Sequence, residues 1–222
     1  MTQRTFSRIL VLFLLLTGTV HAMTIREKQF TCPIDGTAFE YMIALSGSQF
    51  GMRLDLQPLG PTPAPWSLPS CPECRFPLFE EEFSDEEIER YRELVESEAF
   101  REVTENKSSY FTLALVKEHD GEAAGEIGYA YLRASWQLEE EREKYEKCLA
   151  LALEQYREDF ESEEHEERVD AWWTSGILVA ELERQLGNFE AALNQVERLR
   201  KEEIDQIGRL AESEVSEPRA IE

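Results

Sequence analysis

The feature that most constrains the fold is a series of apolar residues at helical spacing in the second half of the chain. The stripe that begins at Tyr145 is the clearest, because apolar side chains follow it after three, four, seven, eight, eleven and fifteen positions. This spacing places them on one face of a helix. Residues 127–138, 169–186 and 189–199 show the same period. We therefore predict a mainly α fold.

The N-terminal part of the chain has a different character, and the change comes near Phe79. Five of the nine prolines lie between Leu59 and Pro72, and proline both fixes φ and lacks an amide donor, so this run is not helical. The stretches QFTC and TAFEYMIA alternate as short strands do. Beyond them, Ser84-Asp85-Glu86-Glu87 forms a capping box that opens the first helix. We predict a turn-rich β cap over 23–79, a helical domain over 80–212 and a disordered tail over 213–222.

The segment ILVAELERQLGNFEAALNQVERL is typical of a tetratricopeptide-like hairpin. Gly187 lies in the turn between the two helices, Phe189 follows it by two residues, and the small residues Ala180 and Ala192 allow close packing. Residues 123–160 give a weaker second hairpin. Because such hairpins bury their faces against neighbours, we predict that they stack in one helical bundle.

The first 22 residues have the pattern of a secretory signal peptide. A basic start with Arg4 and Arg8 precedes an apolar run from Ile9 to Leu16, and small residues lead to Ala22. The run is shorter than a membrane span needs. We predict cleavage after Ala22, a periplasmic or secreted protein and no stable membrane anchor. Translation from Met23 would instead give a cytoplasmic protein.

The charge of the chain narrows the class of partner. The formal net charge is -23, and removal of residues 1–22 takes away two arginines and no acid, which gives -25. Such a chain repels phosphate backbones, so nucleic acid is excluded as a partner. The sequence also has no calcium loop of the EF-hand type. We expect a protein or peptide partner.

Two cysteine motifs suggest a metal site, TCPIDG around Cys32 and CPEC at residues 71–74. Zinc is commonly held by two turns that donate two ligands each. The candidate ligands are Cys32, Asp35, Cys71 and Cys74. Asp35 stands where a second cysteine is usual, and a carboxylate oxygen also binds zinc. Glycine follows Asp35, whereas Arg75 takes the corresponding place in the second motif.

Two other interpretations of these cysteines remain open at this point. In an oxidising compartment Cys71 and Cys74 could form a disulfide, as could Cys32 with either of them. The CPEC motif also has the form of a redox-active pair, but acidic neighbours such as Glu73 raise a thiol pKa and disfavour a reactive nucleophile. The fourth cysteine, Cys148, lies on an apolar helical stripe, and we predict that it is buried.

No catalytic motif is recognisable in the sequence. It contains no nucleophile elbow, no glycine-rich phosphate loop and no H-E-x-x-H helix, and we predict that the protein is not an enzyme. Trp136 is expected in the core, and Trp66 is expected to fix the proline-rich loop to the helical body. Trp172 and Trp173 are adjacent and about 100° apart on a helix, so one of them is a candidate partner-binding residue.

These motifs together resemble a bacterial family called domain of unknown function 2225. The resemblance covers roughly residues 30–200 and rests on the paired CPxxG and CPxC motifs, YAYLRASW and GILVAELERQLGNFEAAL. It implies a zinc-ribbon-like N-terminus with four cysteine ligands, followed by repeat-like helices. Cys32, Cys71 and Cys74 match that pattern, whereas Asp35 and Arg75 depart from it. The family has no assigned reaction.

We therefore carry two hypotheses for the function. The first is a non-enzymatic, exported scaffold or protein-binding module, in which a zinc-ribbon-like cap packs on tetratricopeptide-like helices. The alternative is an envelope protein that handles metals or exchanges thiols through Cys32, Cys71 and Cys74. Zn²⁺ is the one cofactor that the sequence suggests.

Overall fold

The computed structural model describes residues 23–103, 108–162 and 169–216, and the predicted signal peptide lies outside them. Helices account for most of these residues, and the strands form two small antiparallel pairs near the N-terminus. This confirms the prediction of a mainly α fold. None of the described helices is both long enough and apolar enough to span a membrane.

The helical part follows the apolar stripes of the sequence. It comprises α2 (Asp85–Glu96), α3 (Glu98–Val103), α4 (Ser109–Asp120), α5 (Ala124–Gln137), α6 (Arg142–Glu161), α7 (Val169–Gln185) and α8 (Phe189–Ser216). The predicted capping box opens α2: the Ser84 amide donates to Glu87 Oε2 at 2.7 Å and the Glu87 amide donates to Ser84 Oγ at 3.3 Å. Helix α8 continues four residues into the tail predicted over 213–222, and 217–222 lie outside the described residues.

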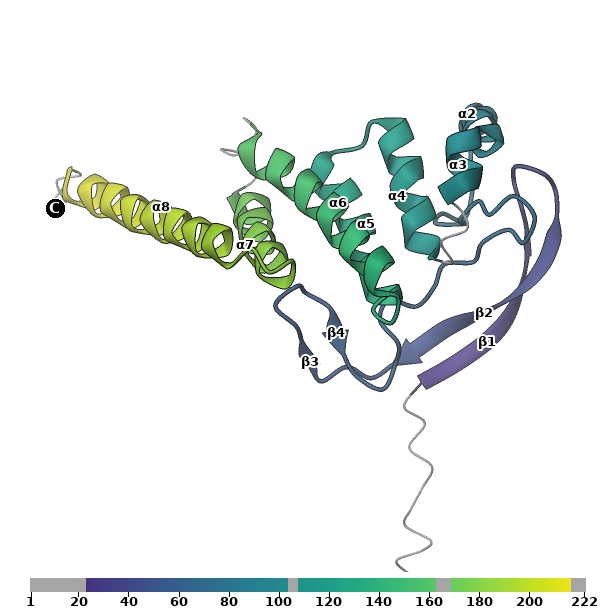
Figure 1. Cartoon of the computed structure of the whole chain (residues 1–222), viewed down its shortest axis with the longest axis horizontal. Coiled ribbons are helices and arrows are strands. Elements are labelled where there is room, and N and C mark those ends of the chain that lie inside the picture. The colour runs from purple at the N-terminus through teal and green to yellow at the C-terminus, as the bar shows by residue number, and fades with distance from the viewer. Residues whose placement is uncertain (1–22, 104–107, 163–168, 217–222) are drawn as a thin grey trace, which may run out of the picture.

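Helices α4 to α8 pack as a series in which each helix contacts the next one along the chain. The core that α4 to α7 share includes Tyr131, Leu132, Leu149 and Leu178, all 2 % exposed or less. Helix α4 was not predicted as a separate helix, and most of its residues are buried. Figure 1 shows α8 projecting from the body at the end opposite to the β1–β2 hairpin (residues 23–47).

The first strand pair forms a long, curved hairpin along the edge of the molecule (Figure 1). Strands β1 (Met23–Thr31) and β2 (Ala38–Gly47) are antiparallel, and their register ends at the pair Thr31 and Ala38. This confirms the strands predicted in QFTC and TAFEYMIA. Strands β3 (Gly51–Met52) and β4 (Pro58–Leu59) make the second pair.

The loop between β3 and β4 is fixed to the helices by a buried carboxylate. Asp55 is 0 % exposed, and its Oδ2 accepts hydrogen bonds from the indole of Trp136 at 3.2 Å and from Gln185 at 3.1 Å. Trp136 is in the core, as predicted. Trp66 joins the proline-rich loop to the helical body through its carbonyl, which accepts a hydrogen bond from the Tyr110 hydroxyl of α4 at 3.2 Å. Its indole also donates to the Met42 carbonyl of β2 at 3.0 Å.

Candidate metal centre

The two cysteine motifs fold into turns with the same hydrogen bonds. In the first, the Cys32 amide donates to the Thr37 carbonyl at 2.8 Å and the Gly36 amide donates to the Cys32 carbonyl at 3.0 Å. In the second, both equivalent bonds, from Cys71 to Phe76 and from Arg75 to Cys71, are 3.0 Å long. Each turn therefore directs its two ligand positions to one side, as a zinc knuckle does.

Each of the two turns is flanked by one antiparallel pair of residues. The first turn begins and ends at Thr31 and Ala38, the last pair of the β1–β2 register. The second is closed by an isolated antiparallel bridge between Ser70 and Pro77. The proline-rich run leads into this bridge and returns the chain to the first turn. Ligand positions from the two turns are therefore side by side although they are at least 36 residues apart in the sequence.

The four candidate ligands converge on one point. One donor atom from each of Cys32, Asp35, Cys71 and Cys74 lies within 4.8 Å of all the others. The Sγ atoms of Cys32 and Cys74 are 3.5 Å apart, and Cys71 Sγ lies 3.4 Å from Asp35 Oδ2. In a tetrahedral site with Zn–S bonds of about 2.3 Å, two sulfur ligands are about 3.8 Å apart. The observed separations are close to that value.

Burial differs among the four ligands. Cys32 and Cys71 are 1 % and 0 % exposed, whereas Cys74 is half-buried and Asp35 is exposed. Beneath the buried pair lies a second core that joins the turns to α2, α3 and α4 through Ile34, Phe76, Tyr91, Val95, Phe100 and Val116. A metal at this point would tie the cap to the same helices.

The electrostatics of the cluster favour a cation. Burial acts to raise the pKa of Asp35, but hydrogen bonds from Thr37 outweigh it and lower that pKa to about 2. The hydrogen bond with Cys74 lowers the pKa of the Cys32 thiol to about 7. The same bond, with burial, raises the pKa of Cys74, and burial raises the pKa of Cys71. A bound metal would take the place of the protons that Cys71 and Cys74 retain.

The donor set fits a zinc ion. Three sulfurs and one carboxylate oxygen are ligands that zinc accepts, and thiolates disfavour the harder Mg²⁺ and Ca²⁺. All four cysteines of the chain are free, and the described residues contain no other cluster of this kind. Cys148 is 1 % exposed in the core of α4 to α7, as predicted, and takes no part in the centre.

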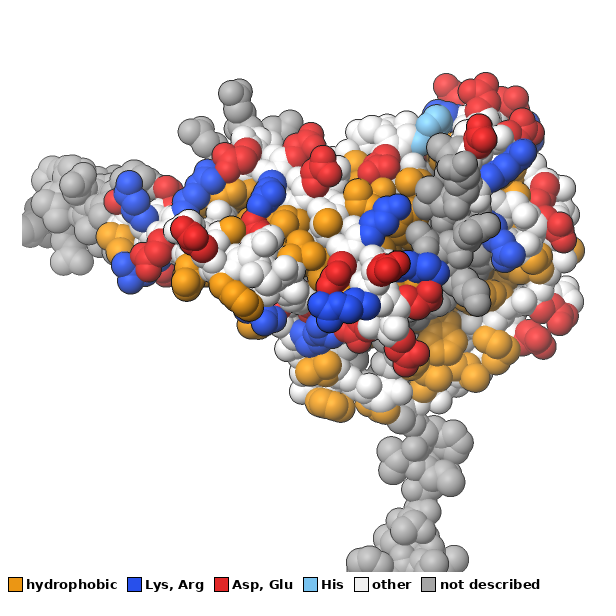
Figure 2. All heavy atoms as spheres, in the orientation of Figure 1, with side chains coloured by type: hydrophobic (Ala, Val, Ile, Leu, Met, Phe, Trp, Pro, Cys, Tyr) orange, Lys and Arg blue, Asp and Glu red, His pale blue; other side chains and the backbone are white. Residues whose placement is uncertain are grey.

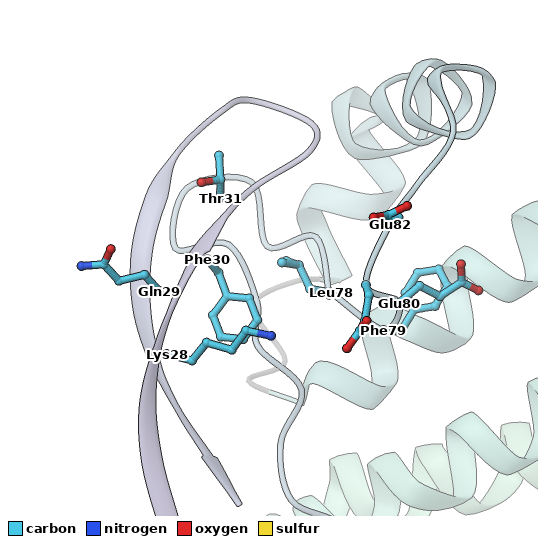
Figure 3. Close-up of a pocket in the computed structure, with 9 residues that line it drawn as sticks. Lys28, Gln29, Phe30, Thr31, Leu78, Phe79, Glu80 and Glu82 are labelled. Atoms are coloured by element: carbon cyan, nitrogen blue, oxygen red, sulfur yellow. The ribbon is translucent and has the colours of Figure 1, made fainter. Parts of the chain in front are cut away.

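Two hollows lie beside the centre. One, of about 430 Å³, is lined by Asp35 and Cys74 together with Arg75 and residues of α2. The other, of about 570 Å³, lies between β1 and residues 78–82 (Figure 3). The ring of Phe30 points into it, and Lys28 Nζ lies 5.1 Å from the centre of that ring. Its remaining charged wall consists of Glu80, Glu81 and Glu82.

The predicted partner-binding residues lie far from this centre along the chain, in the first turns of α7. The Trp172 ring stacks on Phe160 with ring centres 4.7 Å apart, and its indole donates to the Phe160 carbonyl at 3.2 Å. Trp173 meets Trp172 edge to face at 5.1 Å. Both side chains are half-buried.

A comparison with protein-family models gives a match over most of the chain. The model of the bacterial family described as "Uncharacterized protein conserved in bacteria", domain of unknown function 2225, covers residues 25–214. The chain belongs to this family. Membership in the domain of unknown function 2225 family confirms the resemblance drawn from the two cysteine motifs and the helical segments. Comparison with curated proteins gives no match, and comparison with solved structures gives none either.

Proposed function

We propose that this member of the domain of unknown function 2225 family is an exported, non-enzymatic scaffold. In this proposal a structural Zn²⁺ fastens the zinc-ribbon-like cap, and tetratricopeptide-like helices bind a protein or peptide. The observation that carries it is the convergence of Cys32, Asp35, Cys71 and Cys74 within 4.8 Å at the contact between the two turns. One metal ion bound by these four residues would join two turns from distant parts of the chain.

The position of the cluster supports a structural role for the metal. Its two buried cysteines belong to the core that includes Phe76 and Tyr91, whose ring centres lie 5.3 Å apart. Zinc bound here would hold the first turn on this aromatic core. Structural zinc sites contribute folding free energy directly, so the metal would set the stability of the cap.

The helical half supports the scaffold part of the proposal. Helices α4 to α8 contact their chain neighbours in sequence, which is how stacked helical hairpins bury their faces. Trp173 is the residue at which we expect partner binding, because Trp172 is already stacked on Phe160. Replacement of Trp173 by Ala should then abolish capture of an envelope protein and leave the metal content unchanged.

Elemental analysis combined with thiol titration tests the metal centre. We expect one zinc per chain, and we expect three additional thiols to react after chelation. A Cys148→Ala variant is the matched control and should keep its zinc, whereas Cys71→Ala should lose it. Protein without metal, in which two of Cys32, Cys71 and Cys74 are joined as a disulfide, would contradict the proposal.

A second function is favoured by the exposure of one side of the cluster. Asp35 and Cys74 line the 430 Å³ hollow, so a molecule that accepts the metal or exchanges thiols with Cys74 could reach them. A protein that hands over metal or exchanges thiols would lose its zinc quickly to a competing chelator. The rate of that loss separates the two functions, since a structural site releases zinc slowly while the protein stays folded.

A further inference from the structure

The outer face of the last helical hairpin is apolar. Leu193 is 67 % exposed and Phe189 63 %. With Ile177 and Ala180 of α7 and Leu54 of the β3–β4 loop, they line a groove of about 450 Å³. Figure 2 shows hydrophobic side chains along this edge of α7 and α8. The last helix of a stacked array is normally polar on its outer face. Because this face is apolar, we expect another helix to pack on it.

The apolar residues of α8 form one stripe. At 100° per residue, Phe189, Leu193, Val196 and Ile204 fall within an arc of about 80°, and each is at least half exposed. Arg200 lies in the same arc, and its guanidinium pairs with Glu197 at 3.0 Å. Leu199, about 100° around the helix from the centre of this arc, is buried beside Gly176 of α7.

The stripe is complementary to itself in the antiparallel direction. The midpoint of residues 189 and 204 falls between 196 and 197, and the midpoint of 193 and 200 falls at the same place. A second α8 placed antiparallel about this point would set Phe189 against Ile204 of the second copy. It would also set Leu193 against the aliphatic stem of the second copy's Arg200. An interface of this kind is isologous, and two-fold dimers are built from such surfaces.

The charges beside the stripe follow the same symmetry. Glu190 and Lys201 lie eleven residues apart, so they share one edge of the stripe to within about 20°. Their midpoint falls between residues 195 and 196, about 1.5 Å along the axis from the centre of the apolar pairs. Within the described residues neither side chain forms an ion pair. An antiparallel second copy would bring each glutamate to the other copy's lysine.

We infer that the exposed stripe of α8 is a homodimer interface in which two copies pack antiparallel about the point between Val196 and Glu197. The occupant of the groove is thus α8 of a second copy. The net charge of -23 opposes association of two copies in general. Association therefore depends on the stripe, where burial of apolar side chains and two Glu190–Lys201 ion pairs offset the repulsion between the two copies.

Sedimentation equilibrium of the purified full chain tests this inference through a charge exchange. The unmodified protein should be a dimer, and Leu193→Asp should be a monomer with unchanged helical circular dichroism. Glu190→Lys alone should raise the dissociation constant about ten-fold, because attraction becomes repulsion at two symmetric positions. The double variant Glu190→Lys/Lys201→Glu should return the constant to within about three-fold of the original.

A matched control comes from the other end of the molecule. Leu45 on β2 is 51 % exposed, and Leu45→Asp should leave the dimer intact. A monomeric unmodified protein, even one that binds a different protein through Leu193, would overturn the inference. So would a dimer that survives Leu193→Asp, or a double variant that associates as weakly as Glu190→Lys.

Discussion

Gly36 and Arg75 occupy equivalent positions in the two turns of the metal centre, and both have left-handed backbone conformations. Their φ angles are +75° and +64°, and each amide donates to the carbonyl of the first cysteine of its turn at 3.0 Å. Glycine adopts this conformation without steric cost, whereas a residue with a Cβ atom does so at a cost of about 1 kcal/mol. The second turn therefore carries strain that the first one lacks.

Replacement of Arg75 by Gly should stabilise the protein. Removing the Cβ atom relieves the left-handed strain, so we expect the free energy of unfolding to rise by about 1 kcal/mol in the metal-loaded form. Gly36→Ala is the reciprocal change and should lower it by a similar amount. Since no atom lies within 4 Å of a Cβ built at Gly36, its effect would come from the backbone alone. Chemical denaturation measures both, and a destabilised Arg75→Gly would contradict the explanation.

Replacement of Asp35 by Cys should tighten metal binding. The change completes a set of four thiolates, which hold zinc more strongly than three thiolates and a carboxylate, and we expect at least a ten-fold gain in affinity. Asp35→Asn is the control, because it retains an oxygen that can accept the 2.9 Å hydrogen bond from the Thr37 amide but loses the charge. It should weaken zinc binding while the turn persists. Competition with a chromogenic chelator gives both constants.

Cys148 provides a prediction of pH dependence in the helical core. Burial raises the pKa of its thiol from 9.0 to about 12. The native state therefore keeps its proton where the unfolded state has lost it, and stability is complete below pH 9 and falls as pH rises from 9 towards 12. Relative to a Cys148→Ala variant, the unmodified protein should lose about 1.4 kcal/mol of unfolding free energy per pH unit in that window. Parallel slopes for the two proteins would show that Cys148 is not buried as a thiol.

The helical half was predictable because its apolar residues recur with a single period. The stripe from Tyr145 to Phe160 appears as α6, and the break at Gly187 and Asn188 separates α7 from α8. A helix whose pattern is not periodic was not marked separately within the helical domain predicted over 80–212. Helix α4 is buried on most sides, so its sequence SYFTLALV lacks the polar face that marks an amphipathic helix.

The approach of the four candidate ligands to one another was also predictable, but the supporting contacts were not. Spacing within each motif indicates a turn, and two such turns suggest one site. In contrast, Asp55 is one acid among many in the sequence, and its burial against Trp136 and Gln185 joins residues up to 130 positions apart. Such long-range contacts leave no local signal in the sequence. The left-handed φ of Arg75 was only partly predictable. Alignment of the two motifs places Arg75 where the first motif has Gly36, but it does not show that Arg75 keeps the left-handed conformation.

Replacement of Gly176 by Ala should destabilise the helical body, although Ala is the better helix former by about 1 kcal/mol. A Cβ atom at this position would lie 2.6 Å from Leu199 Cδ2 and 2.7 Å from Phe160 Cε2, so α6 and α8 would have to move away from α7. Overpacking of this kind costs about 1 to 3 kcal/mol.

The comparison with a second variant makes the test specific to packing. Leu199→Ala removes the side chain nearest to the new methyl group and creates a cavity of its own. In the double variant Gly176→Ala/Leu199→Ala the new methyl group partly fills that cavity, so the two losses of unfolding free energy should add to more than the loss in the double variant. Strictly additive losses would show that Gly176 and Leu199 are not in contact, because coupled effects are expected only between neighbours.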